Sequence, residues 1–357
     1  MSVAGNGNAP LRVGVIGFGY WGPNLVRNFA TLEGATVTMV ADRDAIRRKQ
    51  ARRLYPKTEV LAEGLALVTS ENVDAVAIAV PAAAHYELTR AALAHGKHVL
   101  VCKPLACNGR DCDALTALAQ RQARVLMVDH TFVFTGAVRK IHELIAGGEL
   151  GDLYYYASTR VNLGKLQQDV SVLWDLAVHD LSILDYLVSE APSAIQAEGL
   201  RYVGQQDEVA SVNLRYPSGF AAHIRVSWLS PVKIRFTELV GSRKMVVYDD
   251  VEPSEKVKLY DKGVALDQID ETPAKPVYRA GDVFVPTLDR TEALEVMAHH
   301  FLDCVKEGRR PLTDGRAGAR VVRWLEAARH SASLGGEFVP LTPSGGSAGA
   351  GVRLDGE

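Results

Sequence analysis

The chain of 357 residues has few cysteines, no long apolar run and no excess of charge of one sign. Its cysteines form neither a paired framework nor a CxxC zinc motif, so we expect no metal and a reducing, cytoplasmic compartment. No apolar run reaches the ~18 residues of a membrane helix, and residues 1–10 lack the features of a signal peptide. The 40 Lys+Arg against 42 Asp+Glu give a net charge of −2, so the basic surface of nucleic-acid-binding proteins is not expected. The four cysteines are Cys102, Cys107, Cys112 and Cys304.

Short apolar runs alternate with helical stretches through the first third of the chain. At roughly 150 residues per domain, the length suggests two domains. Alternation of strands with helices of about ten residues predicts βαβ units and a mainly parallel sheet over residues 11–129. The expected strands are 11–16, 36–41, 75–80, 98–101 and 125–128.

After residue 129 the pattern changes to closely spaced strands that alternate apolar with polar residues. A period of two predicts a sheet with one packed face and one free face, typical of antiparallel sheets. The fold class expected is therefore an α/β N-terminal domain followed by an α+β C-terminal domain with a large, mainly antiparallel open sheet. The predicted division is a flexible start (1–10), a first domain (11–129), a second domain (130–340) and a flexible Gly/Ser-rich tail (341–357).

A glycine motif follows the first strand and opens the first helix. In GxGxxG the first glycine makes a tight turn, the second lets the backbone approach a pyrophosphate, and the third lets helix and strand pack closely. This is the dinucleotide-binding (Rossmann) fingerprint. The motif comprises Gly17, Phe18, Gly19, Tyr20, Trp21 and Gly22, all assigned to cofactor binding.

A carboxylate at the end of the second strand supports this interpretation. Asp42 lies twenty residues after Gly22, where it can accept hydrogen bonds from both ribose hydroxyls, and it would repel a 2′-phosphate. This favours NAD, while Arg43 keeps NADP possible because an arginine there could pair with that phosphate. Pro81 and His85 follow the third strand and are assigned to the same cofactor edge, the alternative for His85 being a helix-capping or surface residue.

Two further motifs contain groups suited to proton transfer. Lys103 lies between Cys102 and Pro104 at the carboxyl end of a strand, where ligands of open α/β sheets bind. Asp175 and His179 are four residues apart in the helix expected over 172–188, so they share one helix face and can converge on one ligand. A surface lysine and a structural acid–histidine pair are the alternatives.

Together these three sites resemble the glucose–fructose oxidoreductase/inositol dehydrogenase (Gfo/Idh/MocA) family over roughly residues 11–340. That family combines a Rossmann glycine motif, a Glu-Lys-Pro and an Asp-x-x-x-His helix in a domain with a large open sheet. The resemblance implies that Lys103 and His179 serve proton transfer and substrate alignment, whereas Asp175 holds the sugar and orients the histidine. It also implies a homodimer or homotetramer.

One position departs from the family pattern. Cys102 stands where the family has a glutamate, so the chain lacks a carboxylate that would favour the ammonium form of Lys103. We still assign Cys102 and Lys103 to the cofactor edge. A reactive thiol at Cys102 is the alternative.

The function expected is an NAD(P)-dependent dehydrogenase or ketoreductase acting on a secondary hydroxyl of a sugar, most simply a nucleotide sugar. We favour His179 as the base in oxidation with Lys103 polarising the oxygen, and the opposite assignment stays open. Further substrate contacts are expected at Arg160, Asn162 and Lys165, whose alternative is a solvated loop. The alternatives for the function are an inositol or polyol dehydrogenase, a dehydrogenase of a glycosylated natural product such as an aminoglycoside-type sugar, and a non-catalytic sugar or NAD sensor.

Overall fold

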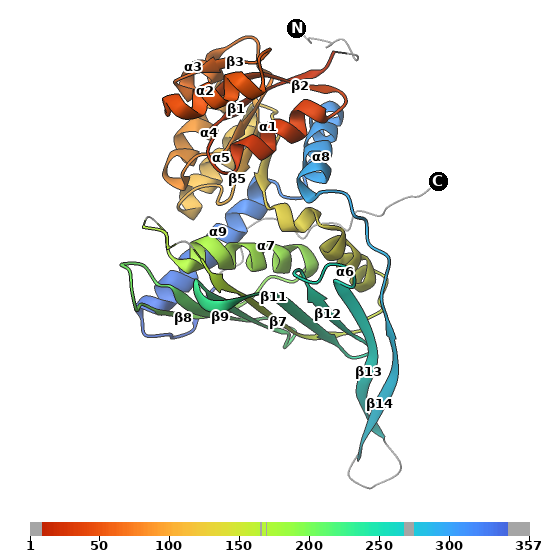
Figure 1. The fold of residues 1–357 in the computed structure, drawn as a ribbon. Coiled ribbons are helices and arrows are strands. Elements are labelled where there is room, and N and C mark those ends of the chain that lie inside the picture. The colour runs from red at the N-terminus through yellow and green to blue at the C-terminus, as the bar shows by residue number, and fades with distance from the viewer. Residues whose placement is uncertain (1–8, 165, 169, 268–274, 342–357) are drawn as a thin grey trace.

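The computed structural model describes residues 9–341 except 165, 169 and 268–274. Two sheets organise the chain, a six-stranded sheet in its N-terminal part and a nine-stranded sheet in its C-terminal part (Figure 1). The predicted fold class is confirmed. Of the predicted flexible ends, 1–10 and 341–357, all but residues 9, 10 and 341 lie outside the described residues.

The first sheet is parallel throughout, with strand order β3-β2-β1-β4-β5-β6. Strand order reverses between β1 and β4, which opens a crevice at the carboxyl ends of these strands. The short β3 and α3 were not predicted. The three residues of β3 are partly exposed and make no apolar run. The strands are β1 (Leu11–Ile16), β2 (Ala35–Ala41), β3 (Glu59–Leu61), β4 (Ala75–Ile78), β5 (His98–Cys102) and β6 (Leu126–Asp129). The helices are α1 (Gly22–Thr31), α2 (Ala45–Leu54), α3 (Gly64–Thr69), α4 (His85–Ala94) and α5 (Gly109–Arg121).

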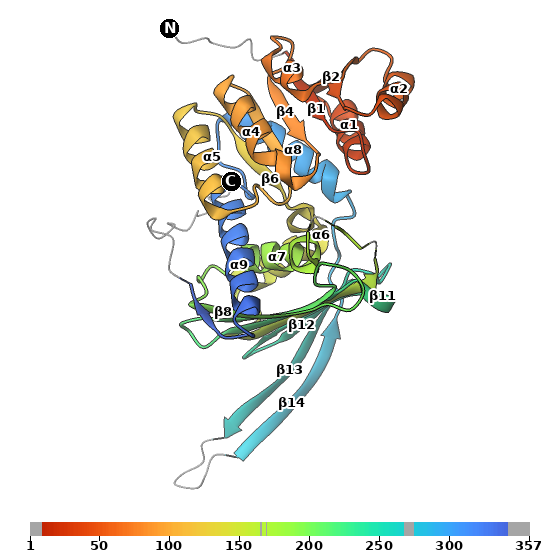
Figure 2. The same cartoon turned by 90° about the vertical axis from the view of Figure 1, so that its left-hand side faces the viewer.

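The second sheet is antiparallel except where β10 pairs with β7. Helices α6 (Gly136–Ala146), α7 (Val178–Leu187) and α9 (Gly315–Ser333) lie over one face, and no helix among the described residues covers the other (Figure 2). The hairpin of β13 and β14 extends away from the body of the molecule (Figure 1). The strands are β7 (Leu153–Leu163), β8 (Ala194–Leu200), β9 (Val209–Arg215), β10 (Ala221–Ser227), β11 (Leu229–Gly241), β12 (Met245–Asp249), β13 (Val257–Asp267), β14 (Lys275–Phe284) and β15 (Val339–Pro340).

Helix α8 (Ala293–Glu307) comes late in the chain but packs beside α1 on the first sheet (Figure 1). Phe29 of α1 and Phe301 of α8 meet edge to face, with ring centroids 6.1 Å apart. A division of the chain at residue 130 therefore separates α8 from the core that it completes. Sequence periodicity identifies a helix but not the sheet on which it packs.

Candidate active site

The glycine loop joins β1 to α1 beside the reversal in strand order. Gly17 has a φ of 95°, and a Cβ there would lie 2.1 Å from the carbonyl oxygen of Ala79. A Cβ at Gly22 would lie 1.9 Å from the carbonyl oxygen of Gly17, so both positions require glycine. The first turn of α1 contains no acidic residue. This tight loop and an uncompensated helix N-terminus fit a dinucleotide diphosphate.

Asp42 is 8% exposed at the end of β2, and its carboxylate faces the glycine loop. It accepts hydrogen bonds from the backbone N–H of Phe18 (2.6 Å) and of Asp44 (2.8 Å). Each carboxylate oxygen keeps a second lone pair, so the group can still accept ribose hydroxyls. The Arg43 side chain is 89% exposed and lies 3.8 Å from Glu63 instead of over this carboxylate.

The arginine beside the predicted ribose site is Arg47 of α2. Its guanidinium lies 3.7 Å from the Asp42 carboxylate and 3.0 Å from where a Cβ on Gly19 would be. Arg47 is not among the site residues predicted from the sequence. The turn of α2 after Asp44 brings it back over the glycine loop, which spacing along the sequence alone did not indicate.

The three residues between the motif glycines point in different directions. Phe18 is 1% exposed and packs edge-on against Tyr55, so its side chain has no surface to offer a ligand. Tyr20 is almost fully exposed and stacks on Trp21. The Trp21 indole N–H donates a 2.6 Å hydrogen bond to Asp129. We therefore remove the Phe18 side chain from the expected cofactor contacts.

Asp129 is a site residue that the sequence analysis missed. It ends β6 opposite Cys102 of β5, is 3% exposed, and accepts hydrogen bonds from the Trp21 indole, the Thr131 hydroxyl and the Cys102 thiol (3.8 Å). Burial raises the pKa of Asp129, and burial together with this carboxyl group raises the pKa of Cys102 well above its usual value. A thiol kept protonated is a poor nucleophile, which disfavours the reactive-thiol alternative. The sequence feature that could have identified Asp129 is its position: a carboxylate at the carboxyl end of a buried strand.

His85 is buried at the start of α4 and connects two loops. One ring nitrogen lies 2.6 Å from the carbonyl oxygen of Pro104 and the other 2.9 Å from that of Val80. The His85 ring is 1% exposed, and burial lowers its pKa. We therefore correct its assignment from cofactor contact to a link between the ends of β4 and β5. Pro81 is exposed and precedes a short 3-10 turn at Ala82–Ala84.

Lys103 and Asp175 meet across 72 positions of sequence. The Lys103 ammonium donates to the Asp175 carbonyl oxygen (2.8 Å) and to its carboxylate (3.2 Å). The other carboxylate oxygen accepts a 3.1 Å hydrogen bond from the indole of Trp228, a 1% exposed residue between β10 and β11 that the sequence analysis also missed. The structure thus brings together the lysine at the edge of the first sheet and the acid above the second.

The helix predicted over 172–188 has two parts. Leu173–Ala177 is π-helical and contains Asp175, and α7 follows with His179 in its first turn. Burial, with a contribution from the charge on Lys103, lowers the pKa of His179 well below its usual value. The His179 imidazole is therefore neutral near pH 7 and can accept a proton.

Arg160 contacts the Phe132 ring, which in turn packs against His179. Phe132 packs edge-on against the His179 ring at 4.9 Å, and the Arg160 guanidinium lies 4.3 Å from the centre of the Phe132 ring. Arg160 forms a buried two-point ion pair with Asp180, at 2.7 and 3.2 Å. It is 5% exposed and does not lie in an open loop, although its Nη1 has no partner within the described structure. Asn162 lies half-buried near the end of β7, and Lys165 falls outside the described residues.

The described residues contain no group of three or more histidine, cysteine or acidic side chains placed to hold a metal ion. They also contain no helix that is both long and apolar enough to cross a membrane.

Comparison with known proteins agrees with this geometry. Residues 11–130 match the oxidoreductase family with an NAD-binding Rossmann fold, and residues 138–247 match the Gfo/Idh/MocA C-terminal domain. The chain belongs to the Gfo/Idh/MocA oxidoreductase family. The resemblance inferred from the three motifs is confirmed, and so are an NAD-binding domain and an enzyme of the oxidoreductase class.

Several Gfo/Idh/MocA proteins align over much of the chain. UDP-N-acetylglucosamine 3-dehydrogenase from Acidithiobacillus ferrooxidans is 24% identical over 87% of this chain and 94% of its own. Its solved structure superposes with a TM-score of 0.76, covering 91% of this chain and 98% of that one. An uncharacterized oxidoreductase from Streptococcus pneumoniae is 27% identical over 58% of this chain and 59% of its own length. Levoglucosan dehydrogenase, solved with NADH and levoglucosan, is 21% identical with a TM-score of 0.79, over 93% of this chain and 99% of that one.

Proposed function

We propose that this enzyme oxidises a secondary hydroxyl of a sugar with NAD, or reduces the corresponding ketosugar. The observation that carries the proposal is the contact of Lys103 with Asp175, which joins the predicted cofactor edge to the predicted substrate helix. His179, one turn beyond Asp175, supplies a neutral imidazole beside this pair. A charged donor and a neutral base at one point can polarise a hydroxyl oxygen and remove its proton.

The cofactor would lie along the carboxyl edge of the first sheet. NAD, when bound, accepts the hydride from the sugar carbon. The glycine loop and the α1 N-terminus hold the diphosphate, and Asp42 accepts the ribose hydroxyls. Trp21, fixed by Asp129, supports that loop. Pro81, Cys102 and Lys103 border the nicotinamide end.

In oxidation, His179 accepts the hydroxyl proton while the Lys103 ammonium stabilises the negative charge that develops on oxygen. Asp175 holds the lysine and accepts a hydrogen bond from a neighbouring sugar hydroxyl, with its carboxylate fixed by Trp228. Asn162, half-buried at the end of β7, is the further substrate contact that we retain.

We infer that the substrate is a nucleotide sugar. The support is the relative that acts on UDP-N-acetylglucosamine, which aligns over nearly its whole length. An inositol or other polyol and a glycosylated natural product are the alternatives.

We also propose that the enzyme is a homo-oligomer. The face of the second sheet away from α6, α7 and α9 is uncovered, and the β13–β14 hairpin exposes large apolar side chains. These include Val264, Val277, Tyr278, Val283 and Phe284, each exposed by 49–77%. Light scattering is expected to give a dimer or tetramer, and a monomer at micromolar concentration would contradict this. The free thiols of Cys102, Cys112 and Cys304 support a cytoplasmic location.

The direct test is a panel of sugars with NAD or NADP, followed by the absorbance of reduced nicotinamide. UDP-N-acetylglucosamine, myo-inositol and an aminoglycoside sample the three substrate classes. Turnover of the nucleotide sugar supports the proposal, whereas turnover of inositol alone would replace the substrate. Tight binding of NAD and sugar without turnover would identify a sensor.

A further inference from the structure

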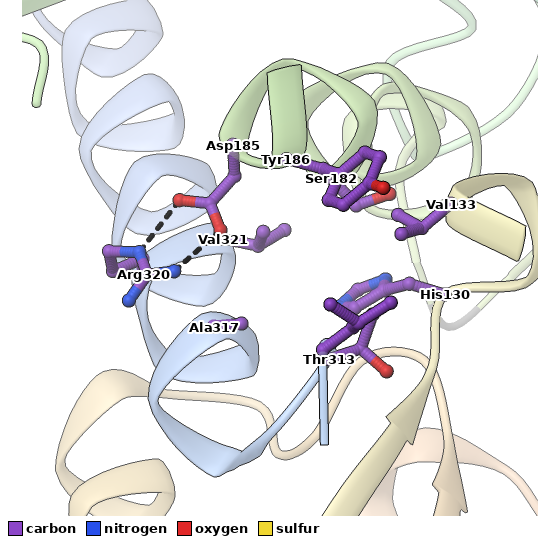
Figure 3. A pocket seen from close by; sticks show the side chains of 10 residues that line it. His130, Val133, Ser182, Asp185, Tyr186, Thr313, Ala317, Arg320 and Val321 are labelled. Carbon is purple, nitrogen blue, oxygen red and sulfur yellow. Dashed lines mark hydrogen bonds and ion pairs between the residues drawn. The ribbon is translucent and has the colours of Figure 1, made fainter. Parts of the chain in front are cut away.

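A small cavity lies beyond His179, between α7, α9 and the turn after β6 (Figure 3). Its volume is about 110 Å³. Its polar lining residues are His130, Ser182, Asp185, Tyr186, Thr313 and Arg320, and Ala317 lines it from α9. A polar cavity of this size has room for water molecules. Asp185 and Arg320 form a two-point ion pair at 2.7 Å on one wall.

His130 is the unexplained group in this cavity. It is 2% exposed, and neither ring nitrogen has a hydrogen-bond partner in the described structure. Figure 3 shows its ring facing Ser182 and Tyr186 of α7. Burial lowers the pKa of His130 to about 3, so the ring is neutral, with one N–H donor and one acceptor nitrogen. A buried polar group without a hydrogen-bond partner is destabilising, so water bound in the cavity is the expected partner of both nitrogens.

The same face of α7 connects His130 to the active site. His179, Ser182 and Tyr186 are three and four residues apart, so they lie along one side of the helix. The Ser182 hydroxyl donates to the His179 carbonyl oxygen at 2.8 Å. Phe132, two residues after His130, contacts the His179 ring.

His179 itself has an unused nitrogen on its buried side. Its Nδ1 has no hydrogen-bond partner in the described structure. Burial lowers the pKa of His179 well below its usual value, and His130 is among the groups whose charge would oppose its protonation. His130 thus lines a cavity that can hold water, and His179 lies three residues before Ser182, another residue of the cavity lining.

We propose that His130 and this cavity form the route by which the substrate proton leaves His179 for solvent. The inference rests on the proposed function. In oxidation the sugar O–H bond breaks and its proton binds His179 Nε2. The Nδ1 proton of the resulting imidazolium passes through water to the acceptor nitrogen of His130, and the other His130 N–H proton passes to cavity water. One proton leaves for each hydride transferred, and exchange with water restores both tautomers.

Arg320 and Leu312 provide the outer end of this route. Their exposed fractions are 37% for the Arg320 side chain and 49% for Leu312, although both line the cavity. Water in the cavity can therefore exchange with solvent past these two side chains. A proton leaving this way would not require release of the product first.

The first test needs no substrate. In protein labelled at histidine nitrogen, the N–H protons of His130 and His179 are expected to exchange with water. Ala317→Leu, which fills the cavity and leaves His130 in place, should slow exchange at both rings by about tenfold or more. Unchanged exchange in Ala317→Leu, or a His130 N–H protected from water in the wild type, would overturn the proposal.

The second test follows proton and hydride in one turnover. A pH-indicator dye reports the released proton and nicotinamide absorbance reports hydride transfer, with the sugar of the panel that is oxidised fastest. In the wild type both signals should rise together, whereas in His130→Gln and Ala317→Leu the proton signal should lag about tenfold and recover with added imidazole buffer. His142→Gln is the matched control, because His142 stacks on Tyr186 but does not line the cavity. Synchronous signals in both cavity variants would refute the route, whereas absence of hydride transfer in the wild type would refute the proposed function and leave the exchange test decisive.

Discussion

Replacing Cys102 by glutamate tests how the site works without the usual family carboxylate. From the sequence alone, Cys102→Glu should move the alkaline limb of the kcat/KM profile upward, because a neighbouring negative charge favours the ammonium form of Lys103. The structure changes this expectation. Position 102 faces Asp129, a buried carboxyl group that already accepts hydrogen bonds from Trp21 and Thr131.

The size of the repulsion between a glutamate at position 102 and Asp129 follows from the distance between these two positions. The Cys102 sulfur lies 3.8 Å from the Asp129 carboxylate. Two negative charges about 4 Å apart repel by about 4 kcal/mol at an effective dielectric constant of 20, which corresponds to roughly three pH units. Burial already raises the pKa of Asp129. The pair in Cys102→Glu is therefore expected to keep one proton near pH 7, so that little net charge is added beside Lys103.

The assay is a set of kcat/KM profiles against pH for the wild type and four variants. Cys102→Ser should reproduce the wild type, and Cys102→Glu should move the alkaline limb by less than about half a pH unit. Cys102→Glu combined with Asp129→Asn removes the competing carboxylate and should move the limb upward by about one unit or more. Asp129→Asn alone is the control. If Cys102→Glu moves the limb as far as the double variant, the coupling of position 102 to Asp129 is refuted.

Three further variants test other parts of the account. Asp42→Ala should weaken NAD binding by about 1.5–3 kcal/mol for each lost charge-assisted hydrogen bond, and NADP binding less; calorimetry showing that the native protein prefers NADP would contradict the role given to Asp42. Arg160→Met leaves Asp180 buried without its partner and should cost about 3–5 kcal/mol in urea unfolding, most of which Asp180→Leu in the same chain should restore; a fully stable single variant would count against a buried charge pair. Asp175→Asn should lower kcat/KM roughly 10- to 150-fold, equivalent to about 1.5–3 kcal/mol, with NAD affinity kept; an equal loss of NAD affinity would show that Asp175 acts on the cofactor site instead.

Residues whose role depends on local sequence were predictable. Gly17 and Gly22 sit in a loop whose shape follows from three glycines between a strand and a helix. Asp42 ends the next strand, and the four-residue spacing of Asp175 and His179 puts both on one helix. In each case the evidence lies within a few residues of the group itself.

Residues whose role depends on contacts between distant segments were missed. Asp129 and Trp228 act through hydrogen bonds to Trp21 and Asp175, which join segments 108 and 53 positions apart. Arg160 was expected to contact substrate, but in β7 its guanidinium lies in the core and pairs with Asp180. Strand periodicity indicates which side of a sheet a residue faces, but not which helix covers that side.

The central claim is that Lys103, with Asp175 and His179, performs the proton chemistry of an NAD-dependent oxidation of a sugar. Its most direct test is reduced-nicotinamide absorbance after NAD and UDP-N-acetylglucosamine are added to the native enzyme and to Lys103→Met, with NAD affinity measured on both. The account predicts NADH formation by the native enzyme and a rate lower by about two orders of magnitude or more in the variant, at unchanged NAD affinity. A Lys103→Met variant that forms NADH at the native rate would contradict it.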